Sequence, residues 1–389
     1  MDTTMQRKVD QFALLPQTGA DTPMGQLLRQ FWHPVAVSKD LKPGTAQAVR
    51  VLGEDLTLYR GESGRPFLIG GRCAHRCTVL HTGWVQGDEL SCMYHGWRYD
   101  GTGRCVDIPA ENKPRLKPIK IPGYPLNEYA GLIFAYLGKG EAPEFDLPKK
   151  PVFEDPDRVV IADKQTWDCN WFQHVENSLD AVHVSFAHVW GAVKQFGTAV
   201  SVAIPELAYA ETSAGIQQTA TRSPTNVRIS NWTFPNNNHV IAPGPRPNDP
   251  WIHVGAWPTP SDDTHTMRFT LYSVDRAWAE ATENFEELFG LNYEPAHHAE
   301  ELFHGRNDLS QMPEMSLITA QDYVAVCGQG QIVDRSMENL STSDAGVAFL
   351  RRIFLREIEA IQEGRPTKVW KSLEATPELP MPQGHQAAE

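Results

Sequence analysis

The sequence lacks an apolar run long enough to cross a membrane, because no stretch of about 18 apolar residues occurs in its 389 residues. Residues 1–23, MDTTMQRKVDQFALLPQTGADTP, also lack the apolar core and cleavage site of a secretory signal peptide. These two absences predict a cytoplasmic protein that does not associate with a membrane.

Positive charge and cysteine are both scarce. Lysine and arginine number 35 against 48 aspartates and glutamates, so the net charge of -13 argues against a nucleic-acid-binding surface. Six cysteines are too few for a disulfide scaffold in a chain of this length, and in a reducing cytosol they would be thiols or metal ligands. They stand at positions 73, 77, 92, 105, 169 and 327.

The length of the chain suggests two domains. Residues 43–155 contain short β-type runs separated by turn signals, which predict an all-β unit. The segment 141–158 is rich in proline and charge and is a candidate domain boundary. Beyond it, β-type runs over 199–275 and helical segments over 276–304 and 343–363 predict an α+β domain around an antiparallel sheet. Ser343 is a candidate cap of the last helix, and Gly364 is its expected end.

Four residues form the first candidate metal site. Cys73 and His75 form C-x-H, and Cys92 and His95 form C-x-x-H after the sixteen residues from Arg76 to Ser91. Two thiolates and two imidazoles suit zinc or a [2Fe-2S] cluster. Zinc fingers pair like ligands, whereas here each loop supplies one of each kind. Mixed loops favour a two-iron cluster, in which the cysteines bind one iron and the histidines the other.

The neighbouring residues agree with this interpretation. Gly96 allows the backbone to approach the sulfides closely, and Trp97 can shield the cluster from solvent. Cys77 and Cys105 do not follow the repeated spacing and are expected to be structural. His81 is expected to be an ordinary loop or surface histidine.

A second candidate site lies in the string ENSLDAVHVSFAH. Asp180 and His183 are three residues apart and share a helix face. His183 and His188 are five apart, about 140° around an ideal helix, so both can reach one ion only if the helix ends or distorts between them. Two imidazoles and a carboxylate would leave positions open on an iron(II) ion. Taken alone, these residues are weak evidence.

Together, the two motifs resemble those of the Rieske non-heme iron oxygenases, in which C-x-H and C-x-x-H precede E-N-x-x-D-x-x-H-x(4)-H. The resemblance extends from DTPMGQLLRQFWHPV to GQIVDRSMENLSTSD and is strongest to the phthalate dioxygenase branch. It implies an all-β Rieske domain at 43–155 and a helix-grip catalytic domain at 156–389, with residues 1–42 packing against the latter.

The resemblance also implies residue roles. Asp322, in QDY, would be the third iron ligand, which composition alone could not choose over Asp308, Glu314 or Asp334. Asp180 would link the cluster of one subunit to the iron of the next, in a head-to-tail trimer or a hexamer. A carboxylate between two imidazole N–H groups is a reasonable link, although a helix cap or ion pair is the simpler role for Asp180.

The function implied is that of a terminal oxygenase. A separate NAD(P)H-dependent reductase, with flavin and a plant-type [2Fe-2S] centre, would supply electrons, since no G-x-G-x-x-G follows a strand here. With O2, the enzyme would hydroxylate or dihydroxylate an aromatic, carboxylated compound, or demethylate a methoxylated aromatic acid. A Rieske electron carrier without oxygenase activity and a zinc-binding structural protein are the alternatives from other classes.

The substrate pocket is expected in the sheet and helices of residues 200–300. Aromatic and amide side chains make Trp232, Phe234, Asn236 and His239 candidates for its lining. A carboxylate could be bound by the guanidinium of one of four arginines, Arg222, Arg228, Arg246 and Arg268.

Overall fold

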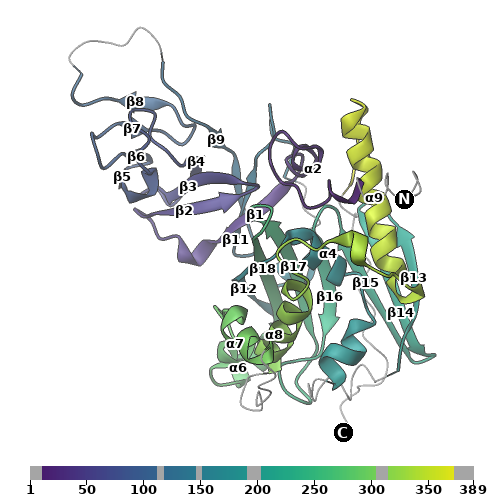
Figure 1. Cartoon of the computed structure of the whole chain (residues 1–389). Helices are drawn as coiled ribbons and strands as arrows, with labels where there is room; N and C mark the ends of the chain where they lie inside the picture. The colour runs from purple at the N-terminus through teal and green to yellow at the C-terminus, as the bar shows by residue number, and fades with distance from the viewer. Residues whose placement is uncertain (1–10, 112–117, 146–150, 191–202, 304–313, 372–389) are drawn as a thin grey trace. The chain divides into compact units, whose positions relative to one another are not determined.

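The computed structural model describes residues 11–111, 118–145, 151–190, 203–303 and 314–371 (Figure 1). The chain forms two compact units. The smaller unit is Leu28–Phe145. The larger unit consists of the residues before Leu28 together with the residues after Phe145. The combination of an all-β unit with a larger sheet-and-helix unit confirms the α+β class.

The smaller unit consists of three antiparallel sheets with the orders β1-β11-β10, β2-β3-β4-β9 and β5-β6-β7-β8. Its strands are β1 (Trp32–Val37), β2 (Ala46–Val51), β3 (Glu54–Arg60), β4 (Pro66–Gly70), β5 (Trp84–Gln86), β6 (Glu89–Ser91), β7 (Arg98–Tyr99), β8 (Cys105–Asp107), β9 (Gly123–Tyr124), β10 (Leu126–Tyr129) and β11 (Leu132–Tyr136). Short 3-10 turns lie at Ser38–Asp40 and Leu80–Thr82. The strands are short, and the turns between them carry the first candidate site.

The smaller unit begins earlier than residue 43, where the sequence placed the domain start. Strand β1 pairs antiparallel with β11, from Trp32 opposite Tyr136 to Val37 opposite Leu132. The pairing joins segments about a hundred residues apart, so local patterning could not reveal it. The unit ends at Phe145, within the proline-rich segment 141–158.

The larger unit is built on a seven-stranded antiparallel sheet of order β12-β18-β17-β16-β15-β14-β13. The strands are β12 (Arg158–Trp167), β13 (Glu206–Glu211), β14 (Gly215–Ser223), β15 (Asn226–Thr233), β16 (Asn237–Ala242), β17 (Ile252–Pro260) and β18 (Thr266–Asp275). From β13 to β18 each strand pairs with the next in sequence, whereas β12 joins the far edge beside β18. Side chains alternate between the two faces, so one face can line a cavity.

The larger unit also contains helices before, between and after the strands of this sheet (Figure 1). They are α3 (Pro151–Glu154), α4 (Trp171–Asn177), α6 (Arg276–Ala281), α7 (Pro295–Phe303), α8 (Glu314–Cys327) and α9 (Ala345–Gln362), with α2 (Pro23–Leu28) near the start of the chain. A π-helix spans Val184–Trp190, and 3-10 turns span Phe285–Phe289, Arg335–Met337 and Thr342–Asp344. No helix within these described ranges is both long and apolar enough to span a membrane.

Two helix predictions need correction. The helical segment expected over 276–304 is broken, because Asn284 and Gly290 adopt left-handed backbone conformations on either side of a 3-10 turn. Ser343 is not the cap of the last helix: the N-cap of α9 is Asp344, and Ser341 forms a capping box with Asp344 around the preceding 3-10 turn. Gly364, with φ of +67°, does follow the end of α9 as expected.

Candidate metal centres and substrate cavity

The two ligand loops of the smaller unit have the same backbone turn. In the first, Cys77 N donates to Cys73 O at 2.9 Å, and in the second, Gly96 N donates to Cys92 O at 2.9 Å. The fifth residue of each turn has a positive φ, +59° at Cys77 and +72° at Gly96. Cys77 is thus the positional counterpart of Gly96 and not of a predicted ligand.

The four predicted ligands come together between these turns. Cys73 and Cys92 are buried, and their thiols interact with each other. The rings of His75 and His95 lie 4.4 Å apart and reach toward solvent, and Trp97 stacks on His75 at 4.8 Å. Paired thiols on the inner side and paired imidazoles on the outer side fit a two-iron cluster ligated on one iron by cysteine and on the other by histidine.

Tyr99 supports this centre, although no motif in the sequence indicated it. Its hydroxyl accepts a hydrogen bond from Ala74 N at 3.0 Å and lies 3.2 Å from Cys73 Sγ. The buried hydroxyl can therefore donate to the sulfur. Hydrogen bonds to cluster sulfurs stabilise the more negative, reduced state and raise its potential.

The second candidate centre joins His183, His188 and Asp322, whose ligand atoms lie within 4.8 Å of one another. His183 Nε2 is 3.5 Å and His188 Nε2 3.3 Å from the same oxygen, Asp322 Oδ1. The required helix distortion is present: α4 ends at Asn177, and the chain re-enters as the π-helix Val184–Trp190. His183 immediately precedes this π-helix, whose hydrogen bonds run from i to i+5, and the wider turn brings His183 and His188 to the same side.

The donor set is prepared electrostatically for a cation. Burial opposes the charge of Asp322, but His188, His183 and Arg268 outweigh it and hold the pKa of this carboxyl below its usual value. Burial lowers the pKa of His183, which favours the neutral imidazole that metals bind. His188 Nδ1 lies 3.0 Å from Gln321 Oε1, so a proton there leaves Nε2 free to ligate. The residues fit a mononuclear iron(II) site.

Asp180 and Asn177 lie beside this centre. Asp180 Oδ1 accepts hydrogen bonds from Val182 N at 3.0 Å and His183 N at 3.2 Å, so this carboxylate acts as a local cap. Its other oxygen is 3.9 Å from His183 Nδ1. Asn177 Nδ2 donates to Asp322 Oδ1 at 3.4 Å, an interaction that was not expected from the sequence.

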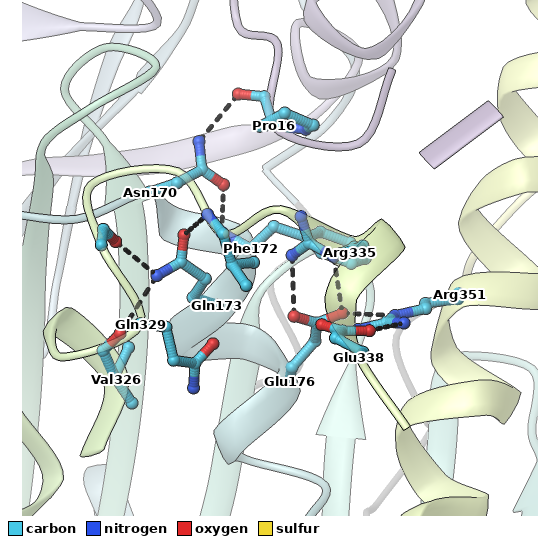
Figure 2. Close-up of polar contacts among 12 residues, drawn as sticks. Pro16, Asn170, Phe172, Gln173, Glu176, Val326, Gln329, Arg335, Glu338 and Arg351 are labelled. Carbon is cyan, nitrogen blue, oxygen red and sulfur yellow. Dashed lines mark hydrogen bonds and ion pairs between the residues drawn. The ribbon is translucent and has the colours of Figure 1, made fainter. Parts of the chain in front are cut away.

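Helix α4 is fixed by buried polar contacts, which Figure 2 shows. Glu176 binds Arg335 at 2.7 Å and Arg351 at 2.6 Å, and all three side chains are buried. Gln173 Nε2 donates to the carbonyls of Val326 and Gly330, both at 3.0 Å. The Gln173 contacts tie α4, which leads to His183, to the end of α8, which carries Asp322. The Glu176 pairs tie α4 to α9 and to the 3-10 turn Arg335–Met337.

A cavity of about 200 Å³ adjoins the second centre. It is lined by His183, His188 and Asp322 and also by residues that the sequence did not indicate, including His174 and Asn177. Burial lowers the pKa of His174 to about 3, so this side chain is neutral near pH 7. The sheet contributes Gln218, Arg222, Arg228, Ser230, Asn238, Val240, Arg268 and Tyr272.

Arg228 lines the cavity as predicted, but the other four lining candidates do not. On β16, Asn238 and Val240 face the cavity, which places His239 on the opposite face, where its Nε2 is 3.3 Å from His253 Nδ1. Asn236 is buried and donates to Pro258 O. Trp232 and Phe234 pack against Phe354. Composition identified the segment but could not tell which face of the strand meets the cavity.

Of the four candidate arginines, Arg222, Arg228 and Arg268 line the cavity, whereas Arg246 pairs with Asp249 outside it. Burial, together with Arg222, lowers the pKa of Arg228 to about 10. Arg222 Nη2 donates to Ala181 O at 3.3 Å, and Arg228 donates to Ile241 O. Within the described residues, neither Arg222 nor Arg228 has an ion pair with an acidic side chain.

Comparison with known proteins decides the family. A model of the Rieske [2Fe-2S] domain matches residues 31–129. The chain is 31% identical over 385 residues to the 5,5'-dehydrodivanillate O-demethylase oxygenase subunit of Sphingobium sp. (strain NBRC 103272 / SYK-6), covering 96% of this chain and 86% of that one. The chain belongs to the Rieske non-heme iron oxygenases.

Two further relatives agree with this assignment. The oxygenase is 31% identical over 369 residues to the phenoxybenzoate dioxygenase subunit alpha of Ectopseudomonas oleovorans, covering 88% of this chain and 83% of that one. Its fold matches that of the terminal oxygenase of carbazole 1,9a-dioxygenase from Novosphingobium sp. KA1, with a TM-score of 0.66 and 20% identity. The match covers 92% of this chain and 99% of that one.

The family fixes the general function. This oxygenase is the terminal component of a multicomponent system, carries a Rieske [2Fe-2S] cluster and a mononuclear iron, and receives its electrons from a protein partner. It is an oxidoreductase that incorporates oxygen from O2.

Proposed function

We propose that the oxygenase hydroxylates or dihydroxylates a carboxylated aromatic compound whose carboxylate binds Arg222 and Arg228. The observation that supports this most strongly is that two partly buried guanidinium groups without an acidic partner in the described chain share a cavity with His183, His188 and Asp322. A charge partly removed from solvent favours a counter-ion, and a carboxylate matches the planar guanidinium.

His183, His188 and Asp322 are the proposed iron ligands. When bound, iron(II) with two imidazoles and one carboxylate supplies the open positions needed to activate dioxygen. The chain's own contribution is orientation: Gln321 fixes the tautomer of His188, and Asn177 holds Asp322. The arginines would bind the far end of the substrate and so direct its ring toward the metal.

Cys73, His75, Cys92 and His95 are the proposed cluster ligands, and Asp180 is the proposed link between the centres. Asp180 and His183 line the substrate cavity and also a second groove on the larger unit. The carboxylate can accept an N–H from an imidazole of a docked cluster while it still caps the backbone at His183.

Exposed apolar side chains support a head-to-tail trimer, or a hexamer of two trimers. Met93 and Tyr94, beside His95, are 48% and 53% exposed. On the larger unit, Leu340 lines the groove that contains Asp180, and Ile332 and Met337 are exposed in the same loop region. Apolar groups at both places would be covered if one subunit's cluster loops docked in the next subunit's groove. Light scattering of the purified protein tests the stoichiometry.

The electron donor is proposed to be a separate NAD(P)H-dependent reductase that contains flavin and a plant-type [2Fe-2S] centre. The test is reduction of the cluster, followed by its visible spectrum, with NADH and a surrogate reductase of this kind. Reduction by NADH without any reductase would contradict the proposal.

Oxidative O-demethylation of a methoxylated aromatic acid is the second candidate. The 31% identity over nearly the whole chain to an O-demethylase oxygenase subunit favours it. Product analysis separates the two reactions, since demethylation releases formaldehyde and dioxygenation yields a cis-diol. A panel of phthalates, methoxybenzoates and biaryl acids would cover both.

The carboxylate site is tested by Arg228→Gln and Arg222→Gln, with Arg246→Gln as the matched surface control. Loss of a buried charged pair costs about 2–4 kcal/mol, so the kcat/KM for the acid should fall roughly 30- to 1,000-fold. The kcat/KM for the uncharged amide analogue of the acid should fall little in the same variants, and their iron content should be unchanged. An equal loss for acid and amide would contradict a carboxylate site.

A further inference from the structure

Two cysteines outside both metal centres face each other in the larger unit. Cys327 is the last residue of α8, and Cys169 immediately precedes Asn170, the N-cap of α4. Their Sγ atoms are 3.0 Å apart although the residues are 158 positions apart in sequence. A disulfide requires an S–S distance of about 2.05 Å, so the sulfurs need to approach by only about 1 Å.

The surroundings make one thiol reachable and hide the other. Cys169 is fully buried with Trp167, Tyr323 and Val326, whereas Cys327 is only partly buried. The hydrogen bond to Cys169, together with burial, raises the pKa of Cys327. A protonated thiol reacts slowly with oxidants, so the pair should stay reduced until hydroperoxide is in excess.

The pair also lies at a junction between the elements of the iron site. Asp322 stands five residues before Cys327 on α8, and Cys169 begins the segment that continues through α4 to His183. The hydrogen bonds from Gln173 to Val326 O and Gly330 O already join these elements at the same place (Figure 2). A covalent bond here would reinforce an existing contact rather than create a new one.

We propose that Cys169 and Cys327 are a dithiol that excess hydroperoxide converts into a reversible disulfide, which fastens the end of α8 to the start of α4. Peroxide first oxidises Cys327: the O–O bond breaks, an S–O bond forms, and one water leaves. The Cys169 sulfur then attacks the sulfenic acid, the S–O bond breaks, the S–S bond forms, and a second water leaves. Two thiols and one peroxide thus give one disulfide and two waters.

The disulfide should slow loss of the mononuclear metal, because it restrains the two elements that present His183 and Asp322. This consequence rests on the proposed iron ligands, whereas formation of the disulfide does not. The two parts can therefore fail separately.

The test is to expose the holoenzyme to hydrogen peroxide, block free thiols by alkylation, and map peptides by mass spectrometry without reduction. We expect linked peptides containing Cys169 and Cys327, which separate after treatment with dithiothreitol. In Cys169→Ser, Cys327 should stop at sulfenic acid and be trapped by dimedone. In Cys327→Ser, a variant at a less buried position, neither the linked peptides nor the adduct should form.

Exposed Cys77 provides the internal control for oxidation. If Cys77 is fully oxidised while Cys169 and Cys327 remain free thiols, the proposal is wrong. Iron release to a ferrous chelator should be several-fold slower in oxidised than in reduced wild-type enzyme, with no such difference in Cys327→Ser. Equal rates would overturn the fastening role. Absence of mononuclear iron from the untreated enzyme would instead contradict the proposed function and leave the peptide result valid.

Discussion

The two candidate metal centres are built in different ways. The cluster loops are local: each is one tight turn closed by a hydrogen bond from the N–H of its fifth residue to the cysteine carbonyl, and the proposed ligands lie within 23 positions. The iron site combines a π-helix with a residue of α8 more than 130 positions later and depends on buried contacts among α4, α8 and α9. A site built from nearby residues should keep its geometry when contacts elsewhere in the chain are lost. A site assembled from distant segments should not.

The largest expected effect separates the centres directly. His188→Ala should abolish product formation, by at least about 1,000-fold, because it removes a proposed iron ligand on which the chemistry would depend. The visible spectrum of the cluster and its reduction by the reductase should be unchanged. Loss of the cluster spectrum in this variant would contradict two independently built centres.

The next effect tests the dependence of the iron site on buried contacts. Glu176→Gln leaves Arg335 without its carboxylate and weakens the pairing of Arg351. Breaking a buried ion pair costs about 3–5 kcal/mol, so the larger unit should unfold at lower urea concentration. Glu211→Gln is the matched control, because its partly exposed pairs with Arg356 and Lys368 should contribute about 1 kcal/mol or less. Equal losses of stability in the two variants would contradict a special stabilising role of the buried Glu176 pairs.

A smaller effect is expected from Gln321, which contacts the proposed ligand His188 rather than the metal. Gln321→Leu removes the acceptor of His188 Nδ1 and should lower iron affinity about 10- to 100-fold, as is usual for such partners. Gln329→Leu, an exposed position just beyond α8, is the control. The measurement is iron(II) titration of metal-depleted protein. Unchanged affinity would mean that Gln321 does not orient the ring.

The smallest expected effect is on the reduction potential of the cluster. Tyr99→Phe removes a hydroxyl that can donate to Cys73 Sγ, and loss of about 1 kcal/mol of stabilisation of the reduced state would lower the potential by roughly 40 mV. Tyr59→Phe, whose buried hydroxyl donates to Asp88 O instead, should leave the potential unchanged. Redox titration followed by visible absorption measures both. An unchanged potential in Tyr99→Phe would rule out this hydrogen bond.

This contrast also explains which parts of the structure could be predicted. The ligand spacing of the cluster loops, the need for helix distortion between His183 and His188, and the α+β class follow from short-range patterns. Gln321, Asn177, Tyr99 and the arginine partners of Glu176 depend on contacts between distant segments, which one sequence does not contain. The error over His239 arose differently, because composition does not determine which face of a strand meets the cavity.

The iron-to-sulfide ratio of wild type and His183→Ala tests the central claim most directly. One two-iron cluster and one mononuclear site predict a ratio of about 3:2 in wild type and about 1:1 in the variant, with acid-labile sulfide per chain unchanged. A ratio that stays the same in His183→Ala would contradict an iron site at His183, His188 and Asp322.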